Sequence, residues 1–295
     1  MAIVEKKTIG SAAFDVFNYV FLGLLVAVTL YPLYYVLICS FSDYTLLSAK
    51  EGLVLWPVGF SFGAYNSVFR DPMILPSYRN TLLYVVVGTT VNLLMTINGA
   101  YVVSHRGSFM LAKPLNMMIV FTMFFSGGMI PLFIVVRDLG LYNSMWALIL
   151  PTAISTWNLI LMRSSFEGVP VSLLESAKMD GANDFYVLVR IVLPLSLPII
   201  AVITLYCLVD HWNAWFPASI YLQDRARYPL QLILREILII SVMDTSDVSN
   251  YGEIGNYQEV IKYAAIVIAT VPILCVYPFL QKFFVKGIMV GAVKE

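Results

Sequence analysis

Charged side chains are scarce in this sequence. Asp, Glu, Lys and Arg make up only 12% of the 295 residues, and the 18 basic and 18 acidic residues cancel to a formal net charge of zero. Nucleic-acid binding requires a concentrated basic surface, so the composition argues against it. Hydrophobic residues make up 60% of the chain and the mean hydropathy is +0.82, which is more apolar surface than one soluble core can bury. The composition therefore indicates a membrane protein.

Residue types that commonly carry catalysis or bind metals are also few. The three cysteines, Cys39, Cys207 and Cys275, lie in apolar runs, so we interpret them as small core residues rather than as a disulfide framework. The two histidines, His105 and His211, lie far apart, and no H-E-x-x-H motif contains them. The sequence has no Gly-Lys dipeptide and hence no phosphate-binding P-loop. We expect no catalytic residue, no metal site and no cofactor in this chain.

What the sequence does contain is a series of long apolar runs. Each is close to the ~20 residues that a helix needs to cross a hydrocarbon core of about 30 Å. The ten-residue alternation of a membrane barrel is missing, so helices are the expected spanning structure. We predict an all-α polytopic membrane protein, a single domain over residues 1–295 with six transmembrane helices. The predicted spans are residues 16–42, 80–104, 114–136, 139–162, 191–218 and 262–282.

The distribution of Lys and Arg predicts the orientation. Positive charge in short loops stays on the cytoplasmic side, and ten of the 18 Lys and Arg collect on the side that holds both termini. We therefore expect cytoplasmic termini, a cytoplasmic loop at 164–192 and long outer loops at 43–79 and 219–261. Within the last loop, residues 229–242 are apolar but too short to span, which favours an interfacial or re-entrant helix over a plain linker.

The stretch LLESAKMDGANDF, residues 173–185, is unusually polar for its surroundings. Ser172 followed by Glu175 has the spacing of a capping box, which predicts a helix that begins at Leu173. Gly181 is a predicted C-terminal stop, and Asn183 or Asp184 can cap a second short helix that runs on to Pro194. We therefore predict two short helices at an angle, outside the bilayer, although an ordinary solvated connector would show a similar pattern.

This stretch also resembles a known motif. Glu175-Ser176-Ala177, then Asp180-Gly181-Ala182, and later Ile191 to Pro194 look like the cytoplasmic EAA loop of ABC importer permeases, with Ser176 in place of the first alanine. The run at 210–222 is similar to sugar-importer permeases. The long second outer loop and the run at 125–131 most resemble the branch that handles complex oligosaccharides, including uronic-acid polymers such as alginate.

The resemblance implies the type I ABC importer permease fold in a bacterial cytoplasmic (inner) membrane. It also implies the partners: a second, homologous permease that completes a heterodimer, two cytoplasmic ABC ATPases that hold ATP and Mg, an extracytoplasmic solute-binding protein, and an oligosaccharide cargo. In the family, the first short helix of the loop docks into a groove of the ATPase. The residues expected to carry that coupling here are Leu173, Leu174, Glu175, Ser176, Ala177, Asp180, Gly181 and Pro194.

We expect the cargo path at the outer half of the fifth helix. Asp210, Trp212 and Asn213 lie there, and sugars suit an aromatic ring that stacks beside polar groups that bind hydroxyls. An aromatic belt at the membrane surface would leave the same pattern. Two alternatives stay open: a permease for a non-sugar solute, and a polytopic channel in which polar residues line the pore. The candidates for such a lining are Asn92, Asn98 and Asn158.

Overall fold

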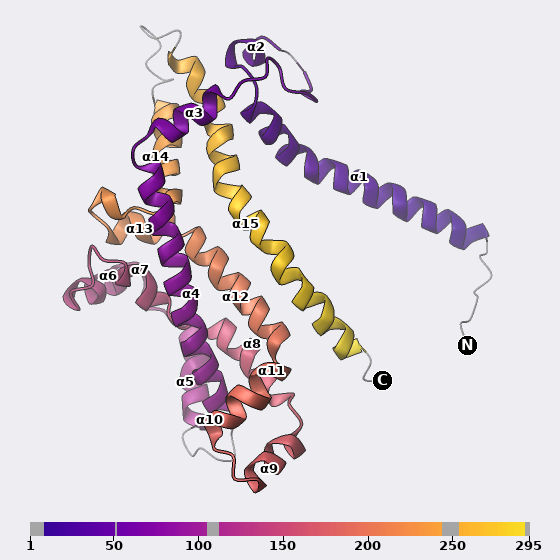
Figure 1. Ribbon diagram of the computed structural model, residues 1–295, viewed down its shortest axis with the longest axis vertical. Helices are drawn as coiled ribbons and strands as arrows, with labels where there is room; N and C mark the ends of the chain where they lie inside the picture. The colour runs from indigo at the N-terminus through magenta and orange to yellow at the C-terminus, as the bar shows by residue number, and fades with distance from the viewer. Residues whose placement is uncertain (1–8, 51, 105–111, 244–253, 293–295) are drawn as a thin grey trace. The chain divides into compact units, whose positions relative to one another are not determined.

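The computed structural model describes residues 9–50, 52–104, 112–243 and 254–292 (Figure 1). Apart from one antiparallel bridge between Ser42 and Phe60, the described residues form helices and turns, which confirms the predicted all-α class. The elements are α1 (Ile9–Ser40), α2 (Tyr44–Ser48), α3 (Gly63–Arg70), α4 (Ile74–Ser104), α5 (Ala112–Phe124), α6 (Met129–Asp138), α7 (Trp146–Ile149), η1 (Leu150–Thr152), α8 (Thr156–Glu167), α9 (Val171–Met179), α10 (Asp184–Val187), η2 (Leu188–Val192), α11 (Leu193–Leu195), α12 (Leu197–Trp212), α13 (Trp215–Tyr221), η3 (Arg225–Arg227), α14 (Leu230–Met243) and α15 (Ile254–Ala292).

The chain forms two compact units. The first consists of residues 1–71 and 237–268, and the second of residues 72–236 and 269–295. In the first unit, Asp43 caps α2 by accepting a hydrogen bond from the Thr45 backbone N–H at 2.9 Å, and the hydrogen bond from the Thr45 hydroxyl lowers the pKa of Asp43. Four aromatic rings, Phe41, Phe60, Phe62 and Tyr65, pack together beside this cap.

The second unit is built around α4. This helix packs against α8 and α12, and one cluster of buried side chains joins all three helices to the segment that follows α9. The cluster consists of Ala100, Leu159, Met162, Phe166, Val169, Val187, Leu188, Val192, Ile203 and Cys207. Figure 1 shows α9 and α10 at one end of this unit, beyond the ends of α8 and α4. A shared core of this kind ties the short helices to the long ones.

The helices that can span a membrane only partly follow the predicted spans. Three described helices are long and apolar enough, at residues 10–40, 74–104 and 260–279. Two bent pairs, one of residues 113–124 with 129–138 (119°) and one of residues 184–195 with 197–212 (84°), bring the number to five if each pair is one span. The count of six spans therefore stays a prediction.

The predicted span at residues 139–162 is interrupted in the structure. Pro151 lies in the first turn of η1, and Ser155 then caps α8 with its side chain, so the run divides into three short pieces. The predicted span at 114–136 bends where Gly128, at φ +85°, precedes α6. The helix expected over residues 229–242 is present as α14.

Candidate functional site

The coupling helix α9 begins earlier than the capping box predicts. Pro170 is the N-cap, with extended backbone, and its carbonyl accepts a hydrogen bond from the Leu173 N–H at 3.1 Å. No side chain caps the helix, and Ser172 is its second residue. The predicted capping box of Ser172 and Glu175 is therefore wrong. Pro170 takes the N-cap position directly before Val171, where its missing N–H removes no hydrogen bond of the helix.

The end of α9 follows the sequence prediction. Gly181 has φ +80°, the Ala182 N–H bonds the Ala177 carbonyl at 2.9 Å, and the Gly181 N–H bonds the Lys178 carbonyl at 3.0 Å. This pair of bonds is a Schellman motif, in which glycine takes the left-handed conformation at no steric cost. The chain therefore turns sharply after α9.

The second short helix is capped as expected. The side chain of Asn183 accepts a hydrogen bond from the Tyr186 N–H at 2.8 Å, at the start of α10. A π-helical turn, η2, follows α10 and leads into α11, which contains Pro194. Pro194 has no N–H to offer the carbonyl of Arg190, four residues earlier, so an ordinary α-helix could not continue unchanged through this point.

The faces of α9 differ from the expected docking face. Leu174 and Ala177 pack against the buried cluster of the protein itself, together with Ala182. Leu173 stays exposed, as do Glu175, Ser176, Asp180, Gly181 and Pro194. Met179, which sequence reasoning did not select, is 88% exposed, and Phe185 is 74% exposed. Leu173, Met179 and Phe185 are thus among the apolar side chains that this segment leaves available to a partner, together with Val171 and Tyr186.

A cavity of about 520 Å³ with a mixed polar and apolar lining lies elsewhere in the same unit. Asp210 and Asn213, both predicted for the cargo path, line it side by side with residues far away in the sequence. The sequence places Asn213 within the fifth helix, but in the structure it is the exposed C-cap of α12, at the break before α13. The polar part of the lining consists of Asn92, Thr152, Ser155, Asn158, Asp210, His211 and Asn213. The remaining lining residues are Leu148, Pro151, Ile154, Cys207, Ala214 and Pro217.

Hydrogen bonds across this cavity join three elements. Nε2 of His211 donates to Oδ1 of Asn92 at 2.7 Å, and Nδ2 of Asn92 donates to the Thr152 carbonyl at 2.6 Å. His211 and Asn92 are both buried. Gly88 makes room for the imidazole, because a Cβ at that position would lie 2.4 Å from His211 Nε2. The sequence signal for this arrangement was the presence of Asn and His in apolar helices, but their pairing was not predicted.

Comparison with known proteins assigns the chain to a family. A family model described as binding-protein-dependent transport system inner membrane component matches residues 1–290. The chain belongs to this family. The expected resemblance to ABC importer permeases is thereby confirmed, and the protein is a permease component of the inner membrane.

Several relatives of the permease match over nearly their whole lengths. In Bacillus subtilis (strain 168), the polygalacturonan/rhamnogalacturonan transport system permease protein YtcP is 44% identical, over 95% of this chain and 98% of its own. Protein LplC of the same organism is 42% identical, over 98% of this chain and 97% of its own. Among solved structures, a chain of a bacterial ABC transporter involved in the import of the acidic polysaccharide alginate matches with a TM-score of 0.84 and 33% identity, covering 95% of this permease and 100% of that chain.

Trp212 is not part of the cavity wall of this permease. Its side chain is only 4% exposed, its Nε1 donates to the Ala269 carbonyl at 2.9 Å, and Tyr78 packs against it edge-on at 6.2 Å between ring centroids. A ring so enclosed offers no free face to a sugar. The expected stacking platform at Trp212 is therefore not present in this arrangement, and the indole packs α12 against α4 and α15.

Two arrangements that could suggest an enzyme have local structural roles. Asp210 and His211 are neighbours in sequence, but His211 Nε2 is engaged by Asn92. Residues 59–63 match the G-x-S-x-G spacing, yet Ser61 Oγ accepts a hydrogen bond from the Gly63 N–H at 3.1 Å and follows an isolated bridge, not a strand of a sheet. The strand–turn–helix setting of a nucleophile elbow is absent there.

In the described part of the permease, no group of three His, Cys, Asp or Glu is placed to hold a metal ion.

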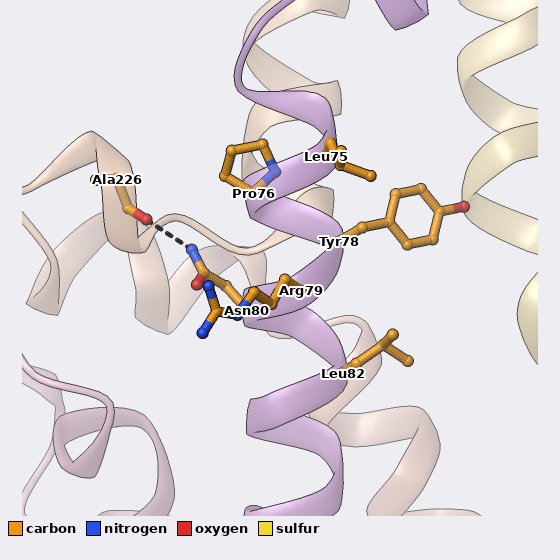
Figure 2. A pocket seen from close by; sticks show the side chains of 7 residues that line it. All are labelled: Leu75, Pro76, Tyr78, Arg79, Asn80, Leu82 and Ala226. Atoms are coloured by element: carbon orange, nitrogen blue, oxygen red, sulfur yellow. Dashed lines mark hydrogen bonds between the residues drawn. The ribbon is translucent and has the colours of Figure 1, made fainter.

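A second hollow of about 730 Å³ lies at the start of α4, as Figure 2 shows. Nδ2 of Asn80 donates to the Ala226 carbonyl at 2.7 Å and to the Tyr228 carbonyl at 3.2 Å, which ties this end of α4 to η3. In the figure, Arg79 and Asn80 point toward the side of Ala226, while Tyr78 and Leu82 point the opposite way. These side chains therefore surround the helix instead of converging on one ligand site.

Proposed function

We propose that this permease forms half of the translocation path of an ATP-driven, binding-protein-dependent importer of oligosaccharides, with acidic, uronic-acid-containing oligosaccharides as its cargo. The observation that carries the proposal is the near full-length similarity to two permeases, one named for polygalacturonan and rhamnogalacturonan and one from an importer of the acidic polysaccharide alginate. A path of this kind opens alternately to the two sides of the membrane while a partner protein supplies the energy.

The cavity supports a hydroxyl-rich cargo. Its polar lining contains three Asn side chains, a Thr and a Ser, and amide and hydroxyl groups both donate and accept hydrogen bonds. Polar groups inside a membrane bundle are retained where a partner or a wet cavity satisfies them. In the complete transporter, a second homologous permease would supply the other half of the wall.

Coupling to ATP hydrolysis is proposed to run through residues 172–185. The exposed side chains of Leu173, Met179 and Phe185 offer apolar anchors to a partner, and those of Glu175 and Asp180 add charge, as docking surfaces commonly do. The Schellman turn at Gly181 and the cap at Asn183 fix the turn between α9 and α10. ATP and Mg would be held by two separate cytoplasmic ATPases, and an extracytoplasmic binding protein would deliver the cargo to loops 43–79 and 219–261.

The proposal is tested with the complete transporter in liposomes, together with its binding protein. Uptake and ATP hydrolysis are measured with acidic oligosaccharides and with neutral oligosaccharides of the same length. We expect acidic oligosaccharides to be taken up and to stimulate ATP hydrolysis more strongly than neutral ones. Equal responses to both classes would refute the acidic cargo, and a lack of uptake of either class would refute the oligosaccharide importer.

A further inference from the structure

The polar groups of the cavity wall are not equivalent. Asn92 uses both ends of its amide within the protein, since Oδ1 accepts from His211 and Nδ2 donates to the Thr152 carbonyl. Ser155 Oγ accepts from the Asn158 backbone N–H as the cap of α8. Asn92 and Ser155 therefore already hold hydrogen bonds within the protein itself.

Asn158 is placed differently. Its side chain lines the cavity but is only 5% exposed, and its Nδ2 has as its partner the Cys207 thiol, with 3.8 Å between nitrogen and sulfur. Sulfur is a weak acceptor. Among the described residues, no hydrogen bond reaches the carboxamide oxygen Oδ1 of Asn158. The Asn158 amide therefore depends on a polar group in the cavity, either water or cargo, to complete its hydrogen bonds.

From this placement we infer that Asn158 is a cargo-contacting residue of the permease, whose amide binds a hydroxyl group of the transported oligosaccharide. This inference rests on the proposed function. A sugar hydroxyl can bond both ends of the Asn158 amide, because it can donate a hydrogen bond to Oδ1 and accept one from Nδ2. The neutral amide suits the hydroxyls that acidic and neutral sugars share, so Asn158 contributes to cargo transport without selecting for charge.

The test compares two matched substitutions in the complete transporter. Asn158→Leu removes the amide from the cavity, whereas Asn98→Leu removes an exposed amide of α4 whose Nδ2 donates to the Leu94 carbonyl of its own helix at 2.7 Å. We expect Asn158→Leu to lower oligosaccharide uptake per assembled complex about fivefold, the effect of losing about one hydrogen bond. Asn98→Leu should leave uptake per assembled complex at the wild-type level.

A second variant keeps the inference open to refutation if Asn158→Leu fails to assemble. Asn158→Ser retains a hydroxyl with less reach, and we expect it to assemble and to lie between wild type and Asn158→Leu in uptake. Uptake equal to wild type in an assembled Asn158 variant would overturn the inference, and so would loss of assembly in both variants. If the wild-type transporter takes up no oligosaccharide at all, the proposed function has failed; if it does and the variants match it, only the role of Asn158 has failed.

Discussion

Gly88 of α4 lies close against the imidazole of His211, which lines the cavity. The imidazole lies where a Cβ of residue 88 would be, and its Nε2 bonds Asn92. His211 therefore cannot withdraw from α4 without giving up that hydrogen bond. Glycine is required here by close approach, since α4 is an ordinary helix at this point.

Replacing Gly88 by alanine tests this contact. Overpacking of a filled site typically costs about 1–3 kcal/mol, and we expect Gly88→Ala to lower the thermal unfolding temperature of the detergent-solubilised permease. Gly23→Ala is the control, because a Cβ at Gly23 meets no atom within 4 Å. An unfolding temperature that is the same for both variants would show that His211 is free to move.

The sequence predicted some residues of the cavity and missed how they combine. Asp210 and Asn213 were selected because polar groups in the outer half of the fifth helix suit the hydroxyls of a sugar. The bond between His211 and Asn92 was not predictable, since it depends on the packing of α12 against α4, across more than a hundred residues. Trp212 was misjudged because a tryptophan next to polar residues suits stacking on a sugar and packing in a core equally well.

In the short helices, the positions where a helix ends depend on neighbouring residues, whereas the choice of buried face depends on residues far away in the sequence. The stop at Gly181 and the cap at Asn183 depend on a few neighbouring residues, and both were predicted correctly. The start of α9 was misplaced because two local signals competed, and Pro170 prevailed over Ser172. Which face of α9 is buried depends on the distant core, so the inward direction of Leu174 and Ala177 was not evident from the sequence.

The two possible caps give opposite expectations for alanine substitutions. Asn183→Ala removes a side-chain cap and should destabilise α10 by about 1 kcal/mol, whereas Ser172→Ala removes no capping bond and should have little effect. Hydrogen exchange of the backbone amides of residues 171–187 measures both. Faster exchange in α9 after Ser172→Ala would contradict the structure.

Docking of α9 on an ATPase is tested at its exposed face. Met179→Asp, and separately the double reversal Glu175→Lys with Asp180→Lys, should abolish transport and weaken association with the ATPase, while the permease itself stays folded and inserted. The reason is that these side chains are exposed and contribute little to the core. Asp138→Lys is the control on another exposed helix end. Wild-type transport in either α9 variant would rule out this docking face.

The number of membrane crossings is a property of the whole chain. Hydropathy predicts six spans because it sums residues along a run, whereas the structure divides some runs at Pro151 and Gly128. Three described helices can cross unbroken, and five crossings are reached only if the bent pairs are counted. Composition therefore predicted a helical membrane protein correctly, and backbone breaks decide the path that each run takes.

The predicted orientation can be measured in intact cells. We expect reporters fused to either terminus to lie in the cytoplasm, and Gln223→Cys, in a Cys275→Ser background, to react with a thiol reagent that does not cross the membrane. Gln223 is exposed and lies in the predicted outer loop at 219–261. A control with only Cys275→Ser should show no labelling. Labelling of Gln223→Cys only after the cells are opened would reverse the orientation.

The π turn at Leu188–Val192 has a geometric consequence for the coupling segment. A π turn holds one residue more than an α turn, and each residue of a helix adds about 100° of rotation. The extra residue thus sets the rotation of α9 and α10 about the helix axis relative to α11. Deleting one residue of the π turn would leave every other side chain in place in the sequence, but it would rotate the exposed side chains of α9 and α10 by more than a quarter-turn. The number of residues in this turn therefore sets the direction in which the exposed side chains of α9 and α10 point. Substitutions, which leave the number of residues unchanged, would not detect this dependence.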